Sequence, residues 1–359
     1  MIFSKAGFGG AVADFEGAVV AQDAKRSGKA FIRLQETFGR AGETELFTGG
    51  PRLAAVLERV PPGPRAVVAV LVGACVERGA DAERCAPGVL AGLRTALEGA
   101  VAFGEAWAAT GGGPFPVPDD GEPGEEIVER TGFAAAVGWW TLSQWETAAV
   151  ALLNHRAVRA GLGEAAVAEG PDDATVRGQA GGRRGELLRL LTAVAQASGQ
   201  ELRCLSYALQ VLDDEPLVAL HRPSATGYLL RLSGIGDNFQ LHTLLADALI
   251  GGGHVAGRAP APQEVAVCRE TPGQVETQGS FELVAPGGDR LWNEGSPAGI
   301  PVVDGVRLLV LDEPSYARTW PAGRFFPGMR GDLILERALE PEETQRWFAR
   351  VSPAGELTV

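Results

Sequence analysis

The side chains best suited to bind a ligand are concentrated in one proline- and glycine-rich segment, residues 312–330, which follows the apolar run Val306–Leu311. Its candidate ligand-binding residues are three arginines and two aromatic residues: Arg318, Arg324, Arg330, Tyr316 and Trp320. A guanidinium group is permanently charged and can hold a carboxylate or a phosphate, while Tyr and Trp rings stack on flat groups. We therefore expect a site for an anion in this loop, because loops that leave buried strands often carry binding residues. The alternative is an ordered loop whose arginines stack on its own aromatic rings and pair with its own acids.

A second loop, residues 290–295, precedes the same apolar run and is expected to form the opposite wall of the site. Its candidate ligand-binding residues are Trp292 and Asn293. The alternative is a surface turn that a single Trp anchors to the protein.

Five further side chains are candidates for proton transfer: His221, Asp237, His242, Asp312 and Glu313. Imidazole and carboxyl groups are the usual general acids and bases of enzymes. Asp312 and Glu313 stand where one expected strand ends. His221 stands at the end of another, from which it could meet His242 or Asp237 in space. The alternative is that each His has a structural role and is held by hydrogen bonds.

No motif in the chain predicts an organic cofactor, a nucleotide or a metal ion. The segment 234–239 (GIGDNF) lies between an expected strand and an expected helix, as a dinucleotide-binding turn would. However, Asp237 stands where a phosphate would come, and Phe239 would hold the helix away from the strand, so we predict a turn and a helix N-cap. The glycine-rich stretches lack the Gly-Lys-Ser/Thr of a phosphate-binding loop, and the four His and four Cys lack the spacings of metal-binding motifs.

Charge, hydropathy and cysteine content narrow the class of protein. A net charge of −13 and the absence of any Lys/Arg tract argue against nucleic-acid binding. The longest apolar run, residues 66–75, is shorter than the roughly 20 residues that span a membrane, and the first residues do not resemble a secretory signal. Four Cys without a CxxC pair are expected to be buried thiols in a reducing cytoplasm. The chain is rich in Arg, Ala, Gly and Pro, which is typical of GC-rich bacterial coding.

Residues 1–184 are predicted to be mostly helical. Apolar residues recur at helical spacing from Pro87 to Thr110, and Thr141–Gln144 resembles a capping box that starts another helix. Segments 111–126 and 163–184 are predicted to be flexible because they are rich in Gly, Pro and charge. The dense group Trp139, Trp140 and Trp145 either lines a pocket or packs between helices, and packing is the commoner outcome.

Residues 185–359 are predicted to form an α+β domain. A helix from Glu186 to about Ala197 is followed by apolar runs at 202–212, 216–221 and 227–233, which turn residues separate as in an antiparallel meander. Asp237 and Asn238 then cap a helix over Phe239–Ile250. Further strands are expected at 264–268, 280–284, 305–311 and 332–336, so that Cys204 and Cys268 would lie in strands, and a last helix begins at Pro341. The predicted fold class is therefore α+β, with a mostly helical N-terminal region and a mainly antiparallel C-terminal sheet.

Two hypotheses for the function remain open. The first is a cytoplasmic binding or adaptor protein that presents the loop 312–330 to an anionic ligand or a protein partner, with a homodimer as a further possibility. The second is an enzyme without an organic cofactor that acts on an anionic small molecule through Asp and His. The enzyme should bring His242 or His221 and a carboxylate beside Arg318, with a perturbed titration. The binding protein should instead expose an apolar or aromatic patch.

Overall fold

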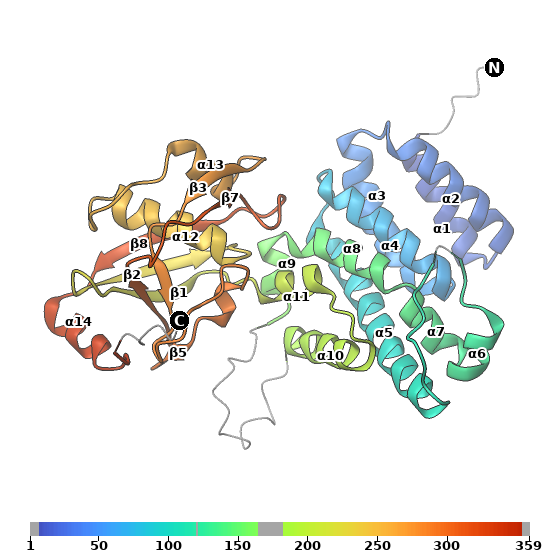
Figure 1. Cartoon of the computed structure of the whole chain (residues 1–359). Helices are drawn as coiled ribbons and strands as arrows, with labels where there is room; N and C mark the ends of the chain where they lie inside the picture. Colours follow the sequence, from blue (N-terminus) through green and yellow to red (C-terminus); the bar gives the residue numbers. More distant parts are fainter. Residues whose placement is uncertain (1–6, 120, 164–181, 354–359) are drawn as a thin grey trace. The chain divides into compact units, whose positions relative to one another are not determined.

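The computed structural model of the chain describes residues 7–119, 121–163 and 182–353, and it has the predicted α+β fold class (Figure 1). The chain forms two compact units, which divide between Leu209 and Gln210. The boundary that we expected, at residues 184/185, falls inside a helix of the first unit, Arg183–Ser198. None of the helices in the described ranges is long and apolar enough to cross a membrane.

The N-terminal unit is helical. Its elements are α1 (Phe8–Val20), α2 (Ala24–Phe38), α3 (Glu43–Val56), the 3-10 turn η1 (Leu57–Arg59), α4 (Pro62–Glu77), α5 (Ala82–Ala109), α6 (Glu125–Thr131), α7 (Phe133–Trp140), α8 (Leu142–Leu153), α9 (Arg156–Ala160), α10 (Arg183–Ser198) and α11 (Arg203–Gln210). The long helix α5 packs against α3, α7, α8 and α10. Close approach to α7 requires glycine on both helices, because a Cβ on Gly138 would lie 2.7 Å from the Cα of Gly99.

One predicted helix start in this unit differs from the structure, and a second helix, α8, starts after Thr141 as predicted but without the predicted cap. Helix α5 begins at Ala82 rather than at Pro87, because the side chain of Asp81 accepts a hydrogen bond from Arg84 N and caps the helix earlier. The predicted capping box at Thr141 is absent. Helix α7 runs up to Trp140, and the Thr141 hydroxyl donates to its Val137 carbonyl oxygen at 2.8 Å instead.

The tryptophan group packs between helices, and two of its members, Trp139 and Trp140, also line a hollow of about 150 Å³. Trp139, Trp140 and Trp145 are all buried, and the ring of Trp139 lies 6.0 Å from that of Phe103 on α5. Part of the predicted flexible segment 111–126 contacts this group, since the Phe115 ring lies 4.9 Å from that of Trp139. In the other predicted flexible segment, residues 164–181 lie outside the described residues.

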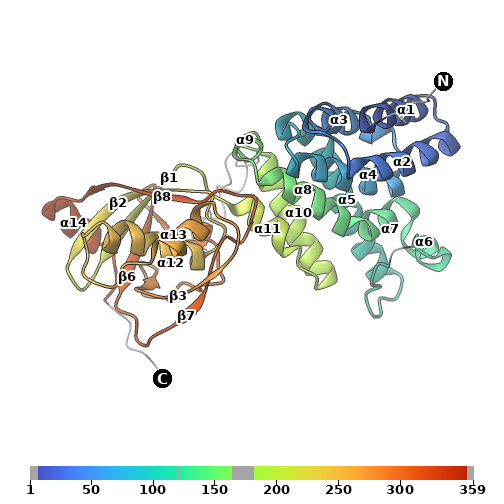
Figure 2. The same cartoon turned by 90° about the horizontal axis from the view of Figure 1, so that it is seen from above.

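The C-terminal unit contains two sheets and several helices (Figure 2). Its elements are β1 (Glu215–His221), β2 (Thr226–Ser233), α12 (Asn238–Ala246), the π-helical turn η2 (Asp247–Gly251), α13 (Pro262–Arg269), β3 (Val275–Gln278), β4 (Glu282–Val284), the 3-10 turn η3 (Pro297–Gly299), β5 (Val302–Val303), β6 (Val306–Asp312), β7 (Thr319–Ala322), β8 (Asp332–Ala338) and α14 (Pro341–Phe348).

The larger sheet has the strand order β4-β6-β1-β2-β8, with β5 also paired to β6. Strands β1 and β6 are parallel, with Ala219 opposite Leu309, and every other pair is antiparallel. The prediction of a mainly antiparallel sheet is therefore confirmed. Strands β3 and β7 form a separate antiparallel pair, in which Thr277 lies opposite Trp320.

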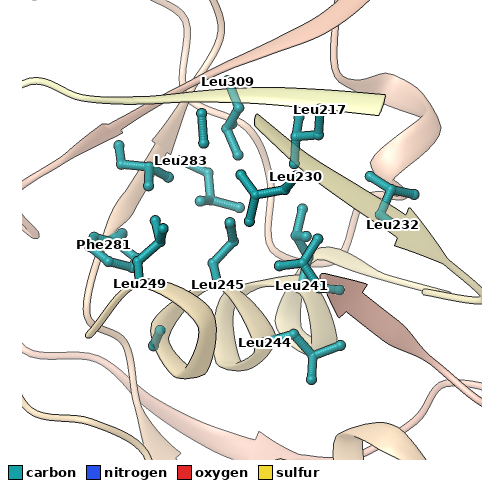
Figure 3. Packing of buried hydrophobic residues seen from close by; sticks show 14 of the residues in the cluster. Leu217, Leu230, Leu232, Leu241, Leu244, Leu245, Leu249, Phe281, Leu283 and Leu309 are labelled. Atoms are coloured by element: carbon teal, nitrogen blue, oxygen red, sulfur yellow. The ribbon is translucent and has the colours of Figure 1, made fainter. Parts of the chain in front are cut away.

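Helix α12 packs on one face of the larger sheet (Figure 3). Leucines of α12 and η2 meet leucines of β1, β2, β4 and β6: Leu241, Leu245, Leu249, Leu217, Leu230, Leu283 and Leu309. Asp237 caps the helix by accepting from Gln240 N at 2.8 Å, so segment 234–239 is the predicted turn and N-cap. On the opposite face, Trp347 and Phe348 pack against a cluster that includes Val218 and Leu308.

Two predicted strands of the C-terminal half are wrong. Residues 264–268 belong to α13, where Pro262 occupies the first turn and the Glu264 carboxylate accepts from Ala261 N. Most of the run 202–212 is helix α11, whose Leu205 N donates to the Glu146 carboxylate at 3.0 Å. Short apolar runs fit either period, so end contacts such as these decide the outcome. Cys204 and Cys268 are therefore helical, and Cys204 is exposed whereas the other three Cys are buried.

Candidate functional site

A small polar hollow in the C-terminal unit is the candidate site. It lies among β4, β7, α12 and the loop that follows β4, and its cavity volume is about 20 Å³. Six of its lining residues have polar side chains: His242, Glu282, Arg290, Asn293, Arg318 and Trp320. A space of this size holds about one water molecule, so the hollow admits a single functional group rather than a whole ligand.

Backbone hydrogen bonds hold the loop after β4 against the start of α12. Asn238 N donates to Gly295 O at 2.8 Å, and Phe239 N donates to Asn293 O at 3.1 Å. The Asn238 side-chain amide adds a bond to Trp292 O at 2.7 Å. This loop therefore satisfies the first backbone N–H groups of α12, and it brings Asn293 close to His242, one helical turn further on.

Two arginines share one carboxylate at the hollow. Glu282 Oε1 lies 2.8 Å from Arg290 Nε and 3.4 Å from Arg318 Nη2. The Glu282 side chain is only 11% exposed, whereas those of Arg290 and Arg318 are 40% and 32% exposed. Each guanidinium gives this carboxylate one nitrogen rather than the two of a bidentate pair. Since Glu282 supplies one negative charge against two positive ones, the charged lining residues carry a net positive charge.

Neighbouring groups fix the two guanidiniums. The guanidinium of Arg318 lies 4.3 Å from the centre of the Tyr316 ring, and Arg290 Nη2 donates to Ser315 Oγ at 3.2 Å. Both contacts come from the loop between β6 and β7. They orient the arginines before any ligand arrives, which lowers the entropy that binding must overcome.

His242 and Trp320, which line the hollow, each have a buried nitrogen that lacks a hydrogen-bond partner among the described residues. The two residues are 4% and 6% exposed, and their rings lie 5.1 Å apart. Neither His242 Nδ1 nor Trp320 Nε1 has a hydrogen-bond partner among the described residues. Burial lowers the pKa of His242 to about 4; the hydrogen bond to Asn293 opposes this shift, and the charge of Arg318 adds to it. The imidazole is therefore neutral at neutral pH, and Trp320 offers an unused N–H donor.

Several of the residues that we predicted for the site lie together. His242, Asn293, Arg318 and Trp320 all line the hollow. Tyr316 stacks on Arg318, while Trp292, next to Asn293, is 80% exposed.

Two predicted arginines lie elsewhere. Arg324 donates to Met329 O at 3.1 Å, as in the alternative of a loop that is held by its own contacts. Arg330 forms an exposed ion pair with Glu270 at 2.7 Å. The segment 312–330 is thus divided by β7, and neither arginine lines the hollow.

The other acid–base candidates have separate roles. Asp237 caps α12, and Asp312 pairs with Arg222 at 2.7 Å. His221 Nδ1 lies 2.6 Å from Ser224 Oγ in the β1–β2 turn. Burial lowers the pKa of His221, and the nearby charges of Glu313 and Asp312 partly oppose this shift. Glu313 itself is exposed.

Glu282 and Arg290 were not among the predicted site residues. One signal for Glu282 is present in the sequence, because it is an acid between two residues of an expected strand, Phe281 and Leu283, which are 5% and 2% exposed. A carboxylate in such a position requires a cationic partner. The partners come from two loops, and the sequence does not indicate that these loops meet.

Within the described ranges, His, Cys, Asp and Glu form no group of three or more that could hold a metal ion. Comparison of the chain with protein-family models, with curated proteins and with solved structures gives no match.

Proposed function

We propose that the C-terminal unit is a binding module that takes an anionic group into this hollow, and that the protein acts as a binding or adaptor protein. One observation carries the proposal: Arg290 and Arg318 share a single oxygen of Glu282, so the lining has an excess of positive charge. In the described part of the chain, Arg318 donates through Nη2 alone. Its remaining nitrogens can therefore form charge-assisted hydrogen bonds to an incoming anion.

The unused indole N–H of Trp320 supports the same proposal. A buried donor without an acceptor costs about 1–3 kcal/mol, which an anion oxygen bound at this nitrogen would recover. An anion would thus accept from a guanidinium and from an uncharged donor at the same time.

The enzyme hypothesis has two observations in its favour: His242 and Glu282 line the same hollow as Arg318, and the pKa of His242 is shifted. However, a His with a pKa of about 4 is a weak base at neutral pH, and proton transfer is most efficient when the pKa is near the working pH. Glu282 is already bound by two arginines. Trp292 follows a residue that lines the hollow and Tyr316 stacks on Arg318, and both rings are exposed, as we expect of a binding protein. Binding is therefore the better supported function.

We place this function in the cytoplasm. Burial raises the pKa of Cys75 and of Cys85 to about 12 and that of Cys268 to about 11. Such thiols stay protonated, as expected of small apolar core residues in a reducing compartment.

Titration with acetate tests the proposal. In the ¹⁵N-labelled full chain, the Trp320 indole signal, identified by its loss in Trp320→Phe, should shift saturably with sodium acetate and not with sodium chloride. Arg318→Gln should abolish the shift. Arg324→Gln is the matched control and should retain it, because Arg324 does not line the hollow. An indole signal that acetate does not move, or moves equally in Arg318→Gln, would refute anion binding at this site.

A further inference from the structure

We infer that the bound anion is the side-chain carboxylate of a Glu or Asp residue in a protein partner, and that Trp292 and Tyr316 contact the partner around it. This inference rests on the proposed function and identifies the source of the anion. It makes the hollow the anchor point of a protein interface.

The size of the hollow argues for a side chain rather than a free small molecule. Sites for small molecules usually enclose about 300–1,000 Å³ and bury most of the ligand. A cavity volume of about 20 Å³ has room for about one carboxylate oxygen and leaves the rest of its molecule outside. The residues around the opening of the hollow therefore determine the affinity for the molecule that carries the anionic group.

The surroundings suit a protein surface. In the described ranges, Trp292 and Tyr316 are the only Trp and Tyr among the large apolar side chains that are exposed, at 80% and 60%. Trp292 lies between two residues that line the hollow, Leu291 and Asn293, and Tyr316 stacks on Arg318. Trp, Tyr and Arg are the residues that contribute most often to binding energy at protein interfaces.

The two aromatic residues are held in place in the free protein. Trp292 O accepts from the Asn238 amide at 2.7 Å, which fixes the backbone of Trp292 to α12. The Arg318 guanidinium, which is itself bound to Glu282, lies 4.3 Å from the centre of the Tyr316 ring. Aromatic rings on a fixed backbone lose little conformational entropy when a partner binds.

The charge balance favours a single carboxylate. His242 is neutral, so the lining carries two positive charges and one negative charge. One added carboxylate would neutralise it. A phosphate dianion would leave excess negative charge beside Glu282.

Selection from a display library of random dodecapeptides on the full chain tests the inference. Enriched peptides should share an acidic residue with an apolar neighbour. The enriched peptides are then synthesised with an acetylated N-terminus and an amidated C-terminus, so that the peptide ends carry no charge. A matched set carries Gln in place of Glu, or Asn in place of Asp, at the shared acidic position. Calorimetry should show that the amide substitution lowers affinity about tenfold or more.

Variants separate this inference from the proposed function. Trp292→Ala should weaken peptide binding about tenfold and leave the acetate response of Trp320 unchanged. Ile334→Ala, an exposed apolar residue of β8 in the same unit, should change neither. If acetate binds but no peptide is enriched, or peptides bind regardless of their acidic residue or of Trp292, the inference fails while the proposed function stands. If acetate does not bind, both fail.

Discussion

Two of the hollows in the described ranges have tryptophan in their walls, one in each unit. The helical unit has one of about 150 Å³, whose indoles are bonded within the unit: Trp139 Nε1 donates to Pro116 O at 2.9 Å, and Trp140 Nε1 to Asp119 Oδ1 at 3.4 Å. The hollow of the C-terminal unit is about 20 Å³, yet Trp320 Nε1 has no partner among the described residues. A donor left unpaired at a buried position is unusual and needs an explanation, whereas spare volume between uncharged side chains does not. Unused polar atoms are therefore a better guide to a binding site than volume.

The aromatic residues of the two regions differ in the same way. In the helical unit, Trp139, Phe103 and Phe115 surround one another and complete a core. In the C-terminal unit, Tyr316 stacks on a charged group and stays exposed.

The largest effect that we predict comes from His242. It lines the hollow of the C-terminal unit, whereas no ionisable side chain lines the hollow of the helical unit. Burial lowers the pKa of His242 from 6.5 to about 4, so the unfolded chain binds the proton more tightly. The stability due to the neutral imidazole is therefore complete above pH 6.5 and is lost as the pH falls through that value towards 4, by about 3 kcal/mol. His242→Gln removes this loss. Hydrogen exchange of the α12 amides measures the free energy of unfolding of this unit alone.

A pH profile that the wild type and His242→Gln share would contradict this prediction. It would mean that the His242 imidazole is hydrated in solution. The hollow of the C-terminal unit would then differ from that of the helical unit in its charged arginines and Glu282, but not in a buried neutral imidazole.

A smaller effect comes from a matched pair of substitutions, Trp139→Phe and Trp320→Phe, at positions that are 3% and 6% exposed. Both remove the same atoms, but only Trp139 loses a hydrogen bond. Trp139→Phe should therefore destabilise its own unit by about 1 kcal/mol more than Trp320→Phe destabilises the other. Hydrogen exchange in each unit measures both losses, and equal losses would mean that Trp320 Nε1 has an acceptor in solution.

The sequence was sufficient for elements whose local signals agree. Helix α12 combines an Asp cap with leucines at helical spacing, and β1 and β2 are apolar runs that a short turn separates. Where a short run fits both periods, as in α13, the outcome depends on a proline and a carboxylate at its start.

The candidate site was predicted only in part, because its charged groups meet through long-range pairing. Strand β7 has four residues, one of them Pro321, and it exists because it pairs with β3. That pairing separates Arg318, at the hollow, from Arg324 and Arg330. Strand β4 is shorter still, and the local sequence does not indicate that its Glu282 is the common partner of Arg290 and Arg318. Contacts between short, distant strands leave little trace in the local sequence pattern.

The smallest effect that we predict concerns Glu282, the internal carboxylate that already holds both arginines of the hollow. Glu282→Gln removes this competing charge and should raise the affinity for acetate up to about fivefold, since partly exposed charges interact by about 0.2–1 kcal/mol. Glu336→Gln is the matched control, because Glu336 pairs with Arg231 at 2.5 Å, does not line the hollow, and changes the net charge equally. The acetate titration of the Trp320 indole measures both variants. An equal gain in both would reflect net charge alone. A loss in Glu282→Gln would mean that Glu282 acts mainly by orienting the guanidiniums, so that fixed geometry rather than unused charge distinguishes this hollow from the one in the helical unit.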